Sequence, residues 1–193
     1  MRRRSRPGAL LISRVVLSAA LMLLLISCAT GSRISEKVDH AVEGKWTGIA
    51  AGKSHSLAIR TDGTLWAWGG NGHGQLGDGT TLERYSPVKI NSDNKWVSIS
   101  AGYFHTVALK SNGTLWAWGG NEVGQLGDGS IKTRPGPVQV GQGKQWTSAV
   151  AGYFHTVALQ SDESLWTWGL NEYGQLGDGT TEERHSPVQI SLH

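Results

Sequence analysis

The chain has 193 residues, of which 27 are Gly, nine are Trp and one is Cys, with 38% hydrophobic and 17% charged side chains. This composition excludes an intrinsically disordered chain and a disulfide-rich scaffold. The formal net charge is +3, but five arginines lie in the first 14 residues, and the remainder has 13 basic against 15 acidic residues. Because that remainder is mildly acidic, the charge gives no reason to expect nucleic acid as a partner.

The first 27 residues are typical of an export signal. An Arg-rich start is followed by an apolar run over residues 15–26. A helix needs roughly 20 apolar residues to cross a bilayer, so this run fits the hydrophobic region of a signal better than a permanent anchor. We therefore predict a signal peptide over residues 1–27.

The apolar run leads into Leu25-Ile-Ser-Cys28, which resembles the lipobox of bacterial lipoproteins. In that class the cysteine becomes the lipidated N-terminus, and acyl chains there supply about 0.8 kcal/mol of anchoring per buried CH₂. The resemblance implies lipidation of Cys28, with residues 28–45 as lipidated N-terminus and tether. Ala29, rather than Asp, follows Cys28, so in a Gram-negative cell we expect the outer membrane, on its periplasmic or surface face.

From residue 46 onward the sequence repeats with a period of 50 residues. Each unit opens with a Trp and contains a His, a Trp-x-Trp pair and the sequence Gly-Gln-Leu-Gly-Asp-Gly, and these positions account for all nine tryptophans. A fixed period of this length is the signature of a repeat architecture. The predicted units are residues 46–95, 96–145 and 146–193.

Within a unit the apolar residues alternate as they do in β-strands. In the first unit residues 55–59 and 64–68 alternate on either side of Thr61-Asp-Gly63, which predicts a β-hairpin. The third unit has Asp162-Glu163 at this turn, where a positive φ favours Gly, so we expect a different or strained turn with unchanged strand pairing. Residues 46–50 and 88–90 add outer strands, giving about four strands per unit, as in one propeller blade.

Segments 101–109, 113–119 and 121–129 resemble the regulator of chromosome condensation repeat family, and the resemblance extends over residues 46–193. It implies an all-β fold of β-propeller blades. That family usually forms seven blades, so three repeats of 50 residues predict a partial propeller or half of an oligomeric ring. An open arc exposes an apolar face at each end, and we expect a second copy (a homodimer), a partner carrying further blades, or loss of blades from a longer gene.

Two sets of repeated polar residues are expected to be structural. Copies of one position in three adjacent blades need not converge on an ion, so we predict no metal site, and the family resemblance implies that the histidines bond between strands. The aspartates lie between glycines and are expected to bond their own turns. These residues are His55, His105, His155, Asp78, Asp128 and Asp178.

No sequence motif predicts catalysis or a cofactor. The glycines of segment 72–77 match a dinucleotide-binding pattern, but no following helix is predicted to receive a phosphate, and the later copies lose the first glycine. Ser54 precedes His55, yet neighbours on a strand point to opposite faces, so they do not form a nucleophile and base. We therefore predict no catalytic residue, no cofactor and no bound metal.

The three copies differ most in segments 80–86, 130–136 and 180–186 and in the two residues that begin at positions 72, 122 and 172. Variable loops on a rigid frame suit binding better than catalysis. The arginines could meet a partner's carboxylates or pair with a nearby acid such as Glu83 or Glu183. The candidate partner-binding residues are Leu82, Arg84, Tyr85, Ile131, Arg134, Tyr173 and Arg184.

We therefore predict a membrane-anchored protein-protein interaction module, not an enzyme, that binds an unidentified protein through these loops. One alternative is an extracellular enzyme inhibitor, because secreted propellers that it resembles can block hydrolases. A propeller hydrolase or lyase is a further alternative. Nucleotide exchange on a small GTPase, the best-known activity of the family, conflicts with export from the cytoplasm.

Overall fold

The computed structural model describes residues 44–91 and 95–191. These residues belong to one compact unit, Glu43–His193. The predicted signal peptide, Cys28 and nearly all of the predicted tether lie outside the described residues. Within the described ranges, no helix is long and apolar enough to span a membrane.

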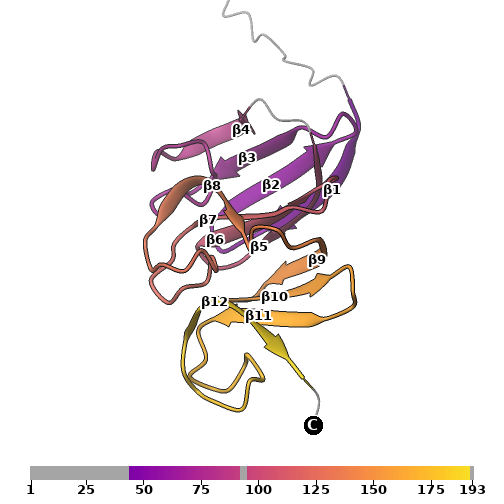
Figure 1. The fold of residues 1–193 in the computed structure, drawn as a ribbon. Coiled ribbons are helices and arrows are strands. Elements are labelled where there is room, and N and C mark those ends of the chain that lie inside the picture. The colour runs from indigo at the N-terminus through magenta and orange to yellow at the C-terminus, as the bar shows by residue number, and fades with distance from the viewer. Residues whose placement is uncertain (1–43, 92–94, 192–193) are drawn as a thin grey trace, which may run out of the picture. The chain divides into compact units, whose positions relative to one another are not determined.

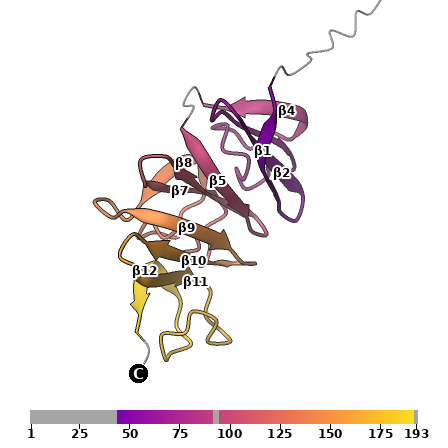
Figure 2. The same cartoon turned by 90° about the vertical axis from the view of Figure 1, so that its right-hand side faces the viewer.

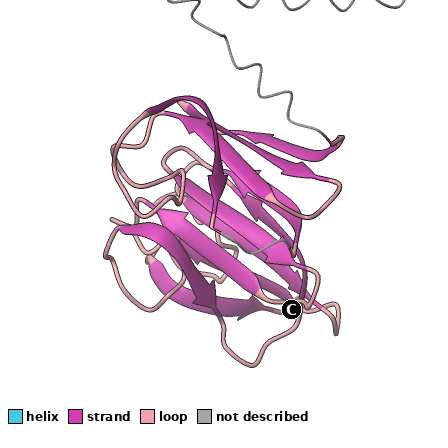
Figure 3. Cartoon of the chain, turned by 90° about the horizontal axis from the view of Figure 1, so that it is seen from above, coloured by secondary structure: helices cyan, strands magenta, loops and turns pink. Residues whose placement is uncertain are grey.

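Twelve strands form three four-stranded antiparallel sheets, and no helix occurs among the residues described (Figures 1 and 3). In each sheet the strands follow one another in chain order, which is the topology of a propeller blade. Blade 1 comprises β1 (Trp46–Ala51), β2 (His55–Arg60), β3 (Leu65–Gly69) and β4 (Arg84–Ile90). Blade 2 comprises β5 (Trp96–Ala101), β6 (His105–Lys110), β7 (Leu115–Gly119) and β8 (Arg134–Val140). Blade 3 comprises β9 (Trp146–Ala151), β10 (His155–Gln160), β11 (Leu165–Gly169) and β12 (Arg184–Ile190). The all-β prediction is confirmed.

The central hairpin of each blade is as predicted. Gly63 and Gly113 occupy the turn with φ of 75° and 76°, and Glu163 takes the same left-handed conformation with φ of 66°. The pairing of β10 with β11 keeps the register of the other two hairpins. The third turn is therefore strained at Glu163 without any change in strand pairing, because cross-strand contacts hold a backbone that Gly would adopt more easily.

The fourth strand is longer than predicted. Sequence alternation indicated residues 88–90, whereas β4 begins at Arg84. The register shifts between Ala67 and Gly69 where β3 meets β4, and this irregularity lets the pairing extend past Pro87, which an edge strand tolerates. The segment predicted as loop 80–86 therefore ends at residue 83, and the equivalent segments end at 133 and 183.

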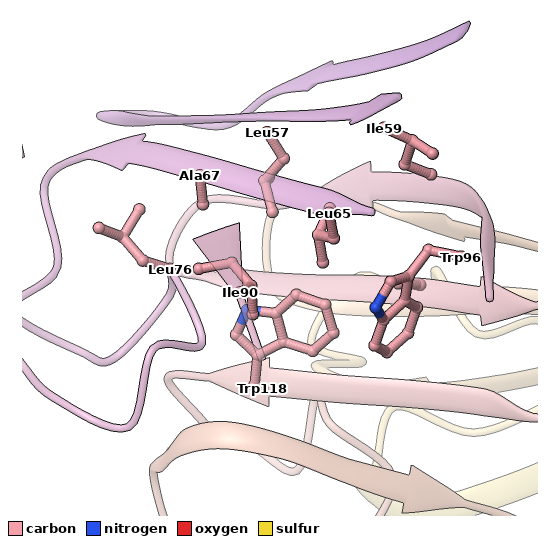
Figure 4. Close-up of a cluster of buried hydrophobic side chains, with 9 residues drawn as sticks. Leu57, Ile59, Leu65, Ala67, Leu76, Ile90, Trp96 and Trp118 are labelled. Atoms are coloured by element: carbon pink, nitrogen blue, oxygen red, sulfur yellow. The ribbon is translucent and has the colours of Figure 1, made fainter. Parts of the chain in front are cut away.

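The hydrophobic core lies between blades. In Figure 4 the side chains of Leu57 and Leu65 from blade 1 point toward Trp96 and Trp118 from blade 2, and Leu76 belongs to the same cluster. Blades 2 and 3 repeat this arrangement, with leucines of blade 2 packed on tryptophans of blade 3. The first strands β1, β5 and β9 also contact one another in turn (Figure 2). Each blade is thus stabilised mainly by its neighbours, as in other repeat proteins.

The tryptophans of the Trp-x-Trp pairs differ in burial. Trp118 and Trp168 are fully buried, whereas the first tryptophan of the Trp-x-Trp pair is half-buried in every blade. Trp66 donates its indole Nε1–H to Thr64 Oγ1 at 3.0 Å, and Trp116 bonds Thr114 in the same way. The half-buried tryptophans therefore brace the hairpin turn of their own blade.

Candidate functional site

The repeated histidines join neighbouring blades. His55 Nε2 lies 3.1 Å from Thr106 Oγ1, and His105 Nε2 lies 3.3 Å from Thr156 Oγ1. The single hydroxyl hydrogen of Thr106 goes to the backbone oxygen of Gln75 at 2.9 Å, so the imidazole must be the donor. The structural role predicted for the histidines is confirmed for His55 and His105, and the strands that they join belong to different blades.

Burial keeps these histidines neutral. Desolvation lowers the pKa of His55 to about 4. For His105, desolvation and, to a smaller extent, the charges of His55 and His155 together lower the pKa to about 3. Nδ1 of both rings is buried and has no hydrogen-bond partner in the described structure, so a proton added there would meet no acceptor. In the described ranges no group of three or more His, Cys, Asp or Glu side chains is placed to hold a metal ion.

The long loop between the third and fourth strands is fixed by one buried asparagine. In blade 2, Asn121 is fully buried, and its side-chain NH₂ donates to Asp128 Oδ1 and to the backbone oxygens of Ser130 and Lys132 at 2.9–3.2 Å. Its own oxygen accepts from the Leu126 backbone N–H at 2.9 Å. Blades 1 and 3 repeat the network at Asn71 and Asn171. The asparagine was not singled out by sequence reasoning, although it is identical in all three copies.

The aspartates bond their own turns as predicted. Asp178 Oδ1 accepts from the Thr180 backbone N–H at 3.0 Å and from the Thr180 hydroxyl at 2.7 Å. Desolvation raises the pKa of Asp178, but the hydrogen bonds from Thr180 and Arg184 outweigh it and bring the pKa to about 2. The carboxylate is therefore ionised throughout the physiological range.

These aspartates also hold the candidate arginines. Nε of each arginine donates to the aspartate of its own loop, at 2.7 Å in blade 1, 2.8 Å in blade 2 and 2.6 Å in blade 3. The acid that pairs with the arginine is this aspartate, whereas Glu83 accepts from the Tyr85 hydroxyl and Glu183 pairs with His185. About one third of each arginine side chain stays exposed. The pairs are Arg84 with Asp78, Arg134 with Asp128 and Arg184 with Asp178.

The four apolar candidates are all exposed, from different parts of the blades. Leu82 is 64% exposed and Ile131 is 56% exposed, and both lie on the loops that the asparagine networks fix. Tyr85 is 94% exposed on β4, and Tyr173 is 87% exposed on the loop after β11. Leu82 and Ile131 therefore mark the variable loops, whereas the two tyrosines lie on the first and the last blade.

Sequence reasoning missed an aromatic cluster on the loops that join the first two strands of each blade. The rings of Tyr103 and Tyr153 lie 4.0 Å apart between centroids, with Phe104 and Phe154 packed beside them. Lys53 Nζ lies 4.1 Å from the centroid of the Tyr103 ring. Residues 51–53, 101–103 and 151–153 line an open hollow of about 400 Å³. The sequence did contain a signal for this cluster, because the second and third copies have Tyr-Phe at residues 103–104 and 153–154 where the first copy has Lys-Ser at 53–54.

The three sheets, each with four antiparallel strands and stacked face to face through tryptophans and leucines, are blades of a β-propeller that does not close within the described residues. Models of the regulator of chromosome condensation (RCC1) repeat match residues 62–109, 112–159 and 162–192, and a second model of the same repeat matches 46–75, 96–125 and 146–175. The chain belongs to the RCC1 repeat family.

Among curated proteins, the E3 ubiquitin-protein ligase HERC2 of Homo sapiens is 38% identical over 64 residues, which are 31% of this chain and 1% of that protein. The ultraviolet-B receptor UVR8 of Arabidopsis thaliana is 43% identical over 42 residues, which are 22% of this chain and 10% of that protein. The chain thus spans a small part of these relatives. Because the two relatives differ in function, the similarity identifies the repeat and not a particular activity.

Among solved structures, yeast RCC1 (Prp20) bound to Kap60 matches with a TM-score of 0.67 and 27% identity, over 76% of this chain and 37% of that one. Prp20p from Saccharomyces cerevisiae, described with its binding properties to Gsp1p and histones, matches with a TM-score of 0.66 and 26% identity, over 76% and 38% of the two chains. The similarity includes all three blades and less than half of each yeast protein.

Proposed function

We propose that this chain is an exported lipoprotein, anchored through Cys28, whose RCC1 blades bind another protein through the loops 80–83 and 130–133. The supporting observation is that these loops are rigid in backbone and apolar at an exposed side chain. Leu82 and Ile131 are more than half exposed, while Asn71 and Asn121 fix the loop backbones from beneath. Apolar side chains on a pre-organised loop lose little conformational entropy on binding.

The proposal is one of binding rather than catalysis. The repeated polar side chains already have structural roles, because His55 and His105 bond the next blade and Asp128 bonds its own loop and Arg134. The exposed third of each arginine remains available to a carboxylate of the partner at the edge of the contact. Yeast RCC1 (Prp20), a relative, was solved bound to the protein Kap60, so a protein with blades of this type has a protein partner.

The binding proposal is tested by site-specific photo-crosslinking of the full chain in bacterial cells. A photoreactive residue at position 82 or 131 should capture the same protein partner, and Leu82→Asp or Ile131→Asp should reduce that capture tenfold or more. Position 61 is the matched control, because Thr61 is exposed at the opposite end of a blade. Equal capture from positions 61, 82 and 131, or none from any of them, overturns the proposal.

The anchor is tested separately by mass spectrometry of the mature N-terminal peptide and by fractionation of the cells. The expected peptide begins at Cys28 and carries acyl chains, and the protein sediments with membranes. Cys28→Ser should release the chain from the membrane fraction while the blades stay folded. An unmodified N-terminus and equal solubility of both forms would refute lipidation and leave the binding proposal standing.

A further inference from the structure

The two faces of a blade are chemically different, and each internal contact joins one kind to the other. The face that we call the Leu face carries Leu109, Leu115 and Leu126 in blade 2, which pack on blade 3. The opposite face, which we call the Trp face, carries Trp96 and Trp118 in blade 2, which pack on blade 1. The Leu face of blade 3 and the Trp face of blade 1 are therefore the two faces without a neighbouring blade among the described residues.

Both of these faces expose side chains that are buried in the other blades. On the Leu face of blade 3, Leu165 is 37% exposed, whereas its equivalent Leu115 is fully buried. On the Trp face of blade 1, Trp46 is 42% exposed, whereas Trp96 and Trp146 are 1% and 2% exposed. The two open faces are thus apolar surfaces of the same kind as the internal interfaces.

The Leu face of blade 3 also has an unfilled position for a tryptophan. A Cβ atom added at Gly77 would lie 2.6 Å from Trp118 Nε1, and one added at Gly127 would lie 2.6 Å from Trp168 Nε1. At Gly177 the same added atom meets nothing within 4 Å. The glycine is therefore at the position where a neighbouring indole packs in the other two blades.

The polar groups of the internal interfaces are repeated on the two open faces. The backbone oxygen of Gln75 accepts hydrogen bonds from Thr106 Oγ1 at 2.9 Å and from Trp118 Nε1 at 3.0 Å. The backbone oxygen of Gln125 accepts from the equivalent groups of blade 3. Gln175 and His155 are the equivalent acceptor and donor on blade 3. Blade 1 carries the matching hydroxyl and indole at the equivalent positions, Ser56 and Trp68.

We propose that two copies of this chain pair reciprocally, with the Leu face of blade 3 in each copy packed on the Trp face of blade 1 in the other. Trp68 of the second copy then lies over Gly177 and donates to the Gln175 oxygen, while His155 donates to the Ser56 hydroxyl. A second copy supplies the required indole and hydroxyl at the spacing that the repeat already uses. Because the pairing is reciprocal, no apolar face is left open. This inference does not depend on the partner-binding loops.

The pairing predicts a specific disulfide between copies. A Cβ added at Gly74 lies 2.9 Å from Pro135 Cβ, and one added at Gly124 lies 3.0 Å from His185 Cβ. The equivalent contact between copies joins position 174 of one to position 85 of the other. The Cβ atoms of a disulfide lie about 3.5–4.5 Å apart, so a small outward shift of the loop brings these two positions to the required separation. The variant is the full chain with Cys28→Ser, Tyr85→Cys and Gly174→Cys, oxidised with copper phenanthroline in mild detergent and run on a non-reducing gel.

The expected product is a two-chain species linked by two disulfides. Tyr85→Cys alone, Gly174→Cys alone, and Gly174→Cys with the mismatched Leu82→Cys are the controls, and none should form this species. Monomer only, an intramolecular link, or cross-linking equal to the controls overturns the proposal. A ladder of three, four and more chains also overturns it, because it would show that the faces join without closing on two copies.

A second variant pair measures the interface without new thiols. Gly177→Ala and Gly179→Ala carry the same backbone strain, since their φ angles are 71° and 78°. An added methyl at residue 177 would collide with the incoming indole, whereas the equivalent of residue 179 in blade 1, Gly79, faces open space. In the Cys28→Ser chain, sedimentation should show at least tenfold weaker pairing for Gly177→Ala and a change of less than twofold for Gly179→Ala. Equal effects of the two variants would refute the proposed contact.

Discussion

Gly77→Ala tests whether the packing of one blade on the next determines stability. Gly77 has a φ of 80°, and an added Cβ would lie 2.6 Å from Nε1 of Trp118, a fully buried side chain. A left-handed backbone costs a non-glycine residue about 1–2 kcal/mol. Overpacking of a well-filled core costs about 1–3 kcal/mol more. The free energy of unfolding should therefore fall by about 2–5 kcal/mol.

Gly79→Ala is the matched control in the same loop. Its φ is 82°, and an added Cβ meets nothing within 4 Å. This variant should lose only the backbone part, about 1–2 kcal/mol. Urea unfolding of the Cys28→Ser chain, followed by tryptophan fluorescence, gives both free energies. Equal losses for the two variants would refute the argument that Trp118 packs too tightly on Gly77 to admit a methyl group.

Three further predictions follow from the turn, the histidines and the buried asparagine. Glu163→Gly should raise the free energy of unfolding by about 0.5–1 kcal/mol, because relief of the left-handed strain exceeds the entropy that Gly adds to the unfolded chain. A lowered midpoint of urea unfolding would contradict this prediction. The folded pKa values of His55 and His105, about 4 and 3, lie below 6.5, so the unfolded chain binds more protons as the pH falls. As the pH falls from 6.5 to 5, each histidine should therefore remove about 2 kcal/mol from the free energy of unfolding, measured by urea unfolding across that range. A free energy of unfolding that does not change with pH would show that these rings protonate freely in the folded chain. Asn121→Ala should lower the free energy of unfolding by about 3 kcal/mol or more, because it leaves several backbone groups of the loop without partners. A loss of less than about 1 kcal/mol, measured by thermal unfolding, would show that water replaces the amide.

Features that depend on residues close in sequence were predictable. The hairpins were correctly placed because alternation and turn residues act within about ten positions, and the strain at Glu163 followed from the missing glycine. The bonding of Asp178 to Thr180 was predictable for the same reason, since the two residues are two apart. The extension of β4 to Arg84 was missed, because an irregular register near Gly69 obscures the alternation in this edge strand.

Features that depend on the neighbouring blade required the tertiary structure. His55 was expected to bond between strands, but its partner Thr106 lies 51 residues away and no local pattern identifies it. The sequence offered Tyr85 as a partner contact, and Tyr85 is 94% exposed. That its equivalents Pro135 and His185 pack on glycines of the preceding blade is visible only in the structure.

The amino-acid sequence by itself determined the repeat, the strands of each blade and the family to which the chain belongs, because these follow from local periodicity and from residues that recur every 50 positions. Only the tertiary structure decided which copies of a residue are buried. Trp46 and Trp96 hold the same place in the repeat, yet one is 42% exposed and the other 1%. The physical reason is that the face of a blade is covered by its neighbour, so burial depends on the blade's place in the stack rather than on its own sequence.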